Sequence, residues 1–361
     1  MRRVVFHYEV RRASPLSYGN YLDACGYSGT EGVIVETARI LADAGHSVVV
    51  AGCSDAPAEG RVTYRDDLAA VDPATVDVLV PSIDAVASPA RHRPVHAFLS
   101  GLRPGTQVIV YLHVHVSESA LVDFVRRTAR LGLGVAFVAV SGPVASHYAP
   151  LCRDLQVRLV TIPNSINAEV FSAPPPAIDR SSRIAFFASY ERGGETARMV
   201  AAELGYEFRC SSYFGPDGRP SLGKRALRRQ LEACDYFVYP LCLPTGQVHH
   251  DTYGCCVHEA LACGAIVITW DVACLRDVFG ENLILLPPPR KWGYDPRAPL
   301  GWNRKMRTSP RVVQTFADAV RWWDGHPDLK EQLRRRGRTW AVERTYADTE
   351  LRRAVLDIFG R

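Results

Sequence analysis

The stretch Asp251-Thr-Tyr-Gly254-Cys-Cys-Val-His-Glu259-Ala-Leu-Ala-Cys-Gly264 decides the fold of this 361-residue chain. Two carboxylates stand eight residues apart, with Gly254 between them. The apolar run 265–269 follows and predicts a buried strand. If Glu259 opens the intervening helix, its carboxylate lies beside free backbone N–H groups at the positive end of the helix dipole. Such a place can bind a phosphate through the amides and a sugar hydroxyl through the acid.

The size and composition of the chain indicate a globular protein of two domains. A length of 361 residues allows two separate cores, and 47% hydrophobic with 22% charged residues is typical of soluble proteins. No apolar run approaches the roughly 20 residues that span a bilayer. An acid and a histidine interrupt the first nine residues, so we do not expect a signal peptide. The ten scattered cysteines favour reduced thiols in a cytoplasmic protein over a disulfide framework.

The charge of the chain is mildly basic, at +5 from 43 basic and 38 acidic residues. Basic clusters lie at 126–130, 224–229 and 334–338. They lack both the interleaved aromatic residues and the recognisable module that nucleic-acid binding requires, so we expect no nucleic-acid partner. Anionic partners fit better, namely a nucleoside diphosphate or an acidic membrane surface that the protein contacts peripherally.

Short apolar strands alternate with amphipathic helices along most of the chain, which predicts an α/β protein with two doubly wound parallel sheets. Prolines 174–176 mark a linker between a domain at 1–173 and a second at 179–340, with a last helix at 341–361. The region 287–310 reads as a long loop. The predicted strands are 3–8, 47–51, 77–81, 107–114, 135–140, 158–162, 183–188, 236–240 and 265–269, and the predicted helices include 31–44, 195–203 and two or three pieces over 309–359.

These features resemble the retaining glycosyltransferases of GT-B fold, in particular glycosyltransferase family 4 (glycosyl transferases group 1). That family carries a pair of acids at this spacing, followed by Glu-Ala, small residues, Gly and a hydrophobic strand. Its first acid is usually Glu, where this chain has Asp251. The resemblance covers most of the chain and implies two Rossmann-like domains facing a central cleft. It places the acceptor side in the first domain and the nucleotide-sugar donor in the second, with the C-terminal helix packing back on the first.

The resemblance also implies roles for residues of the second domain. Glu259 would accept hydrogen bonds from ribose hydroxyls, and Asp251 would lie against sugar hydroxyls, both in the catalytic set. Arg192 and Gly193 match the second cation of the family's phosphate-binding segment and the Gly after it. The first cation has no match in that segment; Arg183, Arg198 and Lys224 are the bases that could replace it. The donor's diphosphate would face the residues after Asp251, which are Tyr253, Gly254, Cys255 and Cys256.

The first domain offers two further segments for the donor. Gly29 and Thr30 precede a predicted helix, where glycine lets the backbone approach a ligand and the helix start favours anions. Thr30 is also an ordinary helix N-cap. His113 and His115 end a predicted strand on one face. One of them is expected to contact the donor sugar, with His113 ahead as a catalytic residue and His115 as a donor ligand; the alternative is a structural histidine. The pair lacks further ligands for a zinc site.

The sequence therefore predicts transfer of a sugar from a UDP- or GDP-linked donor to a glycan, lipid or other hydroxyl acceptor, with no cofactor. Absence of an Asp-x-Asp motif predicts catalysis without a metal, and retention of configuration is implied by the family alone. Two alternatives stay open. One is a non-catalytic GT-B protein that binds a nucleotide or glycan, favoured by Asp251 and the missing cation. The other is a GT-B sugar-nucleotide epimerase.

Overall fold

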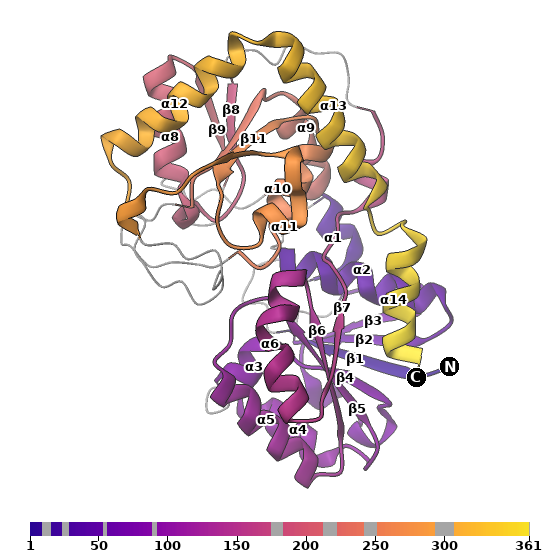
Figure 1. Cartoon of the computed structure of the whole chain (residues 1–361). Coiled ribbons are helices and arrows are strands. Elements are labelled where there is room, and N and C mark those ends of the chain that lie inside the picture. Colours follow the sequence, from indigo (N-terminus) through magenta and orange to yellow (C-terminus); the bar gives the residue numbers. More distant parts are fainter. Residues whose placement is uncertain are drawn as a thin grey trace. The chain divides into compact units, whose positions relative to one another are not determined.

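The computed structural model describes residues 1–8, 16–23, 29–52, 56–88, 92–174, 183–211, 222–241, 251–292 and 307–360. It divides into two compact units, each with a parallel sheet and flanking helices (Figure 1). Most of the predicted proline linker and much of the predicted loop at 287–310 lie outside the described residues. Unit 1 comprises Met1–Tyr21, Thr30–Asn164 and Thr349–Arg361, and unit 2 comprises Leu22–Gly29 and Ser165–Asp348.

Unit 1 contains a seven-stranded sheet in the order β3-β2-β1-β4-β5-β6-β7. All its strands pair in parallel, and β1 lies between β2 and β4, so the direction of winding reverses between β1 and β4. The strands are β1 (Arg3–His7), β2 (Ser47–Ala51), β3 (Val62–Arg65), β4 (Val78–Val80), β5 (Gln107–Leu112), β6 (Gly134–Ala139) and β7 (Arg158–Thr161).

Unit 2 contains a five-stranded parallel sheet in the order β12-β11-β10-β8-β9. Here β8 lies between β9 and β10, so the winding reverses between β8 and β10. The two parallel sheets confirm the predicted α/β class. The strands are β8 (Arg183–Phe186), β9 (Glu207–Cys210), β10 (Tyr236–Tyr239), β11 (Ile266–Trp270) and β12 (Ile284–Leu286).

The helices connect these strands and cover the sheets. None of the described helices combines the length and the apolar character needed to cross a bilayer. In the first half of the chain they are α1 (Tyr18–Asp23), α2 (Gly29–Asp43), η1 (Leu68–Ala70), η2 (Pro73–Thr75), α3 (Ile83–Ala87), α4 (Arg93–Gly101), α5 (Glu118–Arg130), α6 (Gly142–Asp154) and α7 (Ala168–Phe171). In the second half they are η3 (Tyr190–Arg192), α8 (Gly194–Leu204), α9 (Lys224–Glu232), α10 (Cys255–Ala262), α11 (Leu275–Phe279), η4 (Gly280–Asn282), η5 (Arg290–Trp292), α12 (Pro310–Asp324), α13 (Pro327–Glu343) and α14 (Thr349–Gly360).

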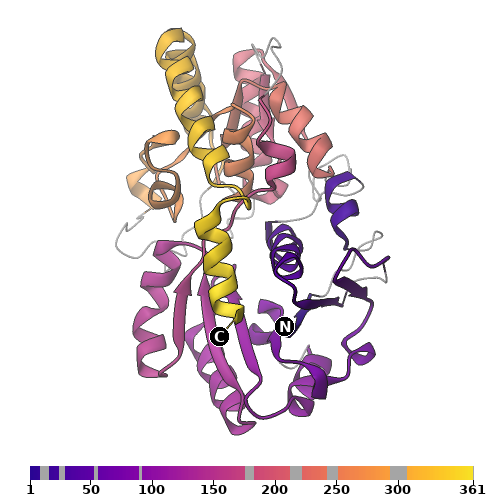
Figure 2. The same cartoon turned by 90° about the vertical axis from the view of Figure 1, so that its right-hand side faces the viewer.

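The last helix, α14, belongs to unit 1 although it follows unit 2 in sequence (Figure 2). The ring centroid of Phe359 lies 5.9 Å from that of Phe6 on β1, and both side chains are buried. Arg352 forms an ion pair with Asp43 at the end of α2, at 3.2 Å. The apolar side of α14 therefore completes the core of unit 1.

The start of α10 differs from its prediction. The helix begins at Cys255, so Glu259 lies in its second turn and does not open it. Gly254 precedes the helix with φ 94°, in the left-handed region that favours glycine. A Cβ there would come within 3.2 Å of Phe279 and 3.3 Å of Leu275. Because Gly254 permits this turn, the helix starts four residues earlier than the position of Glu259 suggested.

His258 fixes α10 against α13 in the core of unit 2. Its Nε2–H donates to the carbonyl of Ala341 at 2.9 Å, and its Nδ1 accepts from the hydroxyl of Tyr253 at 3.1 Å. The ring is fully buried and its centroid lies 5.1 Å from that of Trp340. Burial lowers the pKa of His258 from 6.5 to about 4, so the folded protein holds a neutral imidazole.

This burial predicts a pH-dependent stability. Because the pKa of His258 is lower in the folded state, its contribution is complete above pH 6.5 and is lost as the pH falls toward 4. Between those limits the free energy of unfolding of the wild type should fall faster than that of His258→Gln, by up to about 1.4 kcal/mol per pH unit. Denaturant titrations of both proteins at several pH values measure the difference. Parallel pH profiles would show that the pKa of His258 is the same in the folded and unfolded states.

Candidate functional site

The carboxyl ends of β8 and β10 mark the candidate site of unit 2. Ligands of open α/β sheets bind where the winding reverses, beyond the carboxyl ends of the strands. In unit 2 this point lies between β8 and β10. Tyr239 is the last residue of β10, and η3 with Arg192 follows β8. Tyr239 and Arg192 therefore both lie at the carboxyl edge of the unit 2 sheet, where its winding reverses.

Arg192, Tyr239 and Asp251 form a connected polar cluster. An Nη1–H of Arg192 donates to the Tyr239 hydroxyl at 3.0 Å, and this hydroxyl donates to Oδ2 of Asp251 at 2.8 Å. Nη1 of Arg192 also lies 3.4 Å from the same carboxylate oxygen. Burial raises the pKa of Tyr239 well above its ordinary value, so the phenol stays protonated and donates. Among the described residues these contacts all reach Oδ2, which leaves Oδ1 of Asp251 for a ligand.

The backbone around Arg192 is shaped by two glycines. Gly193 adopts φ 115° between η3 and α8, a conformation that residues with a side chain rarely reach. A Cβ on Gly194 would lie only 2.2 Å from the ring of Tyr190. The chain can therefore turn sharply after Arg192 and hold its guanidinium at the carboxyl edge of the sheet.

Glu259, the second acid, is paired with Lys224. Nζ of Lys224 lies 2.5 Å from Oε1 of Glu259, and the two residues are only 4% and 5% exposed. The other two candidates for the missing cation lie elsewhere, because Arg183 pairs with Glu207 and Arg198 with Glu195. The sequence offered Lys224 as one base among three, and its long separation from Glu259 in the chain gave no signal that they meet.

The first turn of α10 lies among these charges. The thiol of Cys256 interacts electrostatically with Asp251, Arg192 and Glu259, while burial is the main reason that its pKa is raised. A Cβ on Gly254 would lie 3.6 Å from Oδ2 of Asp251. Gly254, the residue before α10, has no side chain with which to cap the helix, so the N-cap residue does not satisfy the first-turn N–H groups. Two carboxylates, two cations and one helix start thus converge within unit 2.

Two other predicted donor residues have little room around them, and one of them, Gly29, belongs to unit 2 and not to the first domain as predicted. A Cβ on Gly29 would lie 2.9 Å from Sγ of Cys255, so only glycine fits there. The Tyr253 side chain is 4% exposed, and its ring lies 5.7 Å from that of Phe279. It therefore packs in the core beneath α10, and only its backbone remains for a ligand. Across the described ranges, no three His, Cys, Asp or Glu side chains gather in a way that could hold a metal ion.

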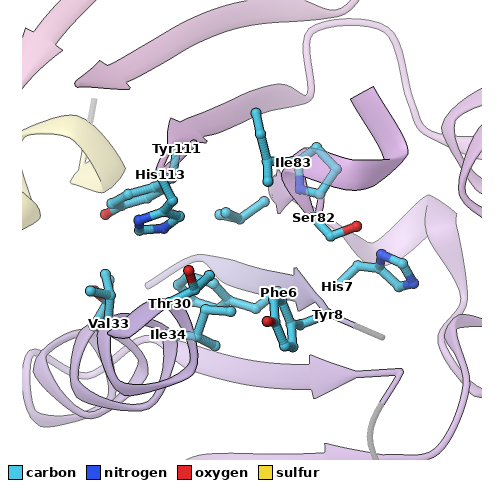
Figure 3. Close-up of a pocket in the computed structure, with 13 residues that line it drawn as sticks. Phe6, His7, Tyr8, Thr30, Val33, Ile34, Ser82, Ile83, Tyr111 and His113 are labelled. Carbon is cyan, nitrogen blue, oxygen red and sulfur yellow. The ribbon is translucent and has the colours of Figure 1, made fainter. Parts of the chain in front are cut away.

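In unit 1, Thr30 and His113 line one cavity (Figure 3). It lies where the winding of that sheet reverses, beyond the ends of β1, β4 and β5. Its volume of about 20 Å³ gives room for about one water molecule. His113 stacks on Tyr111 with the ring centroids 5.2 Å apart, and burial lowers its pKa to about 4. The imidazole is therefore neutral near pH 7.

His115 lies apart from this cavity. Strand β5 ends at Leu112, so the predicted extension to Val114 is wrong. Both histidines follow the strand, and the alternation of side chains along a strand does not determine which face they lie on. The exposed ring of His115 lies 5.1 Å from that of His147 on α6. His115 therefore does not share a pocket with Thr30 and His113.

A larger hollow of about 690 Å³ lies at the opposite edge of the unit 1 sheet. Arg2, Arg103 and Arg158 contribute to its lining, and Arg103 is paired with Asp77 at 3.0 Å. None of the predicted site residues lines it. Because ligands of open α/β sheets bind at the carboxyl edge, this hollow at the amino edge is not the candidate site.

The polar cluster of unit 2 predicts energetic coupling between Tyr239 and Asp251. Tyr239→Phe and Asp251→Asn should each lower the free energy of unfolding by about 1–3 kcal/mol, because each leaves a buried polar group without its partner. The double variant should lose less than the sum, with a coupling energy of roughly 0.5–3 kcal/mol. Denaturant unfolding of the four proteins measures the cycle. Strict additivity would contradict the hydrogen bond.

Comparison with known proteins identifies the architecture. No protein-family model and no curated protein matches the sequence. Among solved structures, sucrose-phosphate synthase from Thermosynechococcus elongatus aligns over 100% of this chain and 98% of its own, with a TM-score of 0.66 and 13% identity. HepE of Anabaena, solved with UDP-glucose, aligns over 100% of both chains with a TM-score of 0.59 and 11% identity. WaaG, a glycosyltransferase involved in lipopolysaccharide biosynthesis, aligns over 99% of this chain and 100% of its own with a TM-score of 0.59 and 12% identity. The chain therefore has the GT-B fold.

Proposed function

We propose that this protein is a glycosyltransferase that moves a sugar from a nucleoside-diphosphate sugar to a hydroxyl group of a glycan, lipid or other acceptor. The observation that carries the proposal is the convergence of Arg192, Asp251, Glu259 and the start of α10 at the carboxyl edge of the unit 2 sheet. HepE, which shares the fold, was solved with UDP-glucose and with UDP. A UDP- or GDP-linked donor is the substrate we propose.

The diphosphate of the donor would bind between Arg192 and the first turn of α10. The N–H groups and the dipole of a helix start favour phosphate oxygens, and a guanidinium can bind two of them at once. As the bond from the sugar to the diphosphate breaks, negative charge develops on the leaving group. Donors that are already in place stabilise this charge without rearrangement. These groups can neutralise the leaving diphosphate without a metal ion.

The carboxylates would recognise the two sugars of the donor. Oδ1 of Asp251 would accept a hydrogen bond from a hydroxyl of the transferred sugar, while Tyr239 and Arg192 hold Oδ2. Glu259 would accept from a ribose hydroxyl. Both acids are committed to binding, which leaves neither as an evident nucleophile. We propose retention of configuration through attack on the same face from which the diphosphate departs.

Within unit 1, Thr30 and His113 would bind a hydroxyl group in the cavity that they line. A cavity with room for one water can also accept a single hydroxyl group. The neutral imidazole of His113 can both donate and accept a hydrogen bond, which suits a sugar hydroxyl. His115 is exposed and lies outside this cavity, so we give it no role in donor binding.

Replacement of Arg192 tests the proposed function. In Arg192→Gln, kcat/KM for transfer should fall by about 10²–10³-fold, because one preorganised partner of the leaving diphosphate is lost. Calorimetry should show weaker binding of UDP or GDP as well. Arg198→Gln is the matched control, since Arg198 lies on the following helix and pairs with Glu195 on the surface. Wild-type protein that neither transfers nor hydrolyses any nucleotide sugar, or an Arg192→Gln variant with unchanged nucleotide affinity, would contradict the proposal.

Metal independence is tested separately. Because Arg192 and the helix start supply the positive charge at the diphosphate, the rate of transfer should persist in excess chelator. The assay compares initial rates with chelator and with added Mg²⁺ or Mn²⁺. A strict requirement for either ion would mean that the leaving group is neutralised by a metal.

A further inference from the structure

Lys224 stands where local energetics disfavour a cation. It is the first residue of α9, at the positive end of the helix dipole, and this first turn contains no acidic residue. The residue is only 4% exposed, so its ammonium has lost most of its hydration. Residues whose charge is unfavourable for their local position, as a buried cation at a helix N-terminus is, concentrate at functional sites. A role is therefore expected for Lys224 beyond the stability of α9.

The partner of Lys224 is one oxygen of the acid that we assign to the nucleotide. The ion pair is made to Oε1 of Glu259, and among the described residues Oε2 has no hydrogen bond or ion pair. At 2.5 Å the ammonium fixes both the charge and the rotation of the carboxylate. Without it, Glu259 would be a buried charge with no cation beside it in the part of the chain that the structure describes, and its carboxylate could rotate.

We propose that Lys224 is a positioning residue for recognition of the nucleotide's ribose. It holds Oε1 of Glu259 so that Oε2 accepts a hydrogen bond from a ribose hydroxyl. The inference rests on the proposed function and deepens it. The preference for a ribonucleotide over a deoxynucleotide therefore depends on the Lys224–Glu259 ion pair, because Lys224 keeps Glu259 in the orientation that binds the hydroxyl.

A second role for the same cation makes a different prediction. If Lys224 left Glu259 and bound the diphosphate, its removal would weaken all nucleoside diphosphates alike, whatever hydroxyls their sugar carries. If it acts through Glu259, its removal weakens the ribonucleotide but hardly changes the deoxynucleotide. The ratio of the two dissociation constants therefore separates ribose positioning from phosphate binding.

The experiment measures binding of UDP, GDP and ADP and of their 2′-deoxy and 3′-deoxy forms by calorimetry, using the full chain. Wild type should bind at least one deoxy form about 10- to 100-fold more weakly than the ribonucleotide, the effect of one charge-assisted hydrogen bond. In Lys224→Met this ratio should fall below about 3-fold. Arg225→Met should keep the wild-type ratio, because the neighbouring Arg225 pairs with Asp23 and Glu169 and not with Glu259.

A double variant serves as the control in case the single variant Lys224→Met does not fold. Lys224→Met with Glu259→Gln leaves no uncompensated buried charge, and it should unfold near the wild-type temperature and show the same loss of discrimination. A folded Lys224→Met protein that keeps the wild-type ratio, or that loses affinity for every nucleotide equally, overturns the inference while the proposed function stands. Wild type that binds none of the three nucleotides contradicts the proposed function, and the inference with it.

Discussion

Two buried carboxylates, each held by a cation, are the constraint on which the candidate site depends. An ionised carboxylate that is shielded from water is stable only with a charged or hydrogen-bonded partner. Asp251 obtains this from Arg192 and Tyr239, and Glu259 obtains it from Lys224. Among the described residues, one oxygen of each acid is bonded to these partners and the other has no hydrogen bond or ion pair. The charge pairs therefore both stabilise the two carboxylates and orient them for a ligand.

The sheet of unit 2 explains how these residues come together. Arg192 follows β8 and Tyr239 ends β10, and these neighbouring parallel strands flank the point where the winding reverses. Gly193 and Gly254 then permit the left-handed turns that begin α8 and α10. Strand order, two glycines and a helix start thus place the charges of the site.

The sequence revealed the central strands and the acid pair because apolar runs and regular spacing are local signals. It missed β3, β9 and β12, which are short strands at the sheet edges and mix apolar with polar residues or span only three positions. It placed Glu259 at the helix start because nothing local shows that the helix begins directly after Gly254. The Lys224–Glu259 pair joins distant segments, so only the folded chain could assign Lys224 a partner.

A crystal structure of the full chain with the nucleoside diphosphate that binds most tightly would test the central claim most directly. The account predicts phosphate oxygens at Arg192 and at the first-turn amides of α10. It also predicts a ribose hydroxyl within hydrogen-bond distance of Glu259 Oε2, with Lys224 still on Oε1. A nucleotide bound by unit 1 alone, or a ribose that faces away from Glu259, would contradict it.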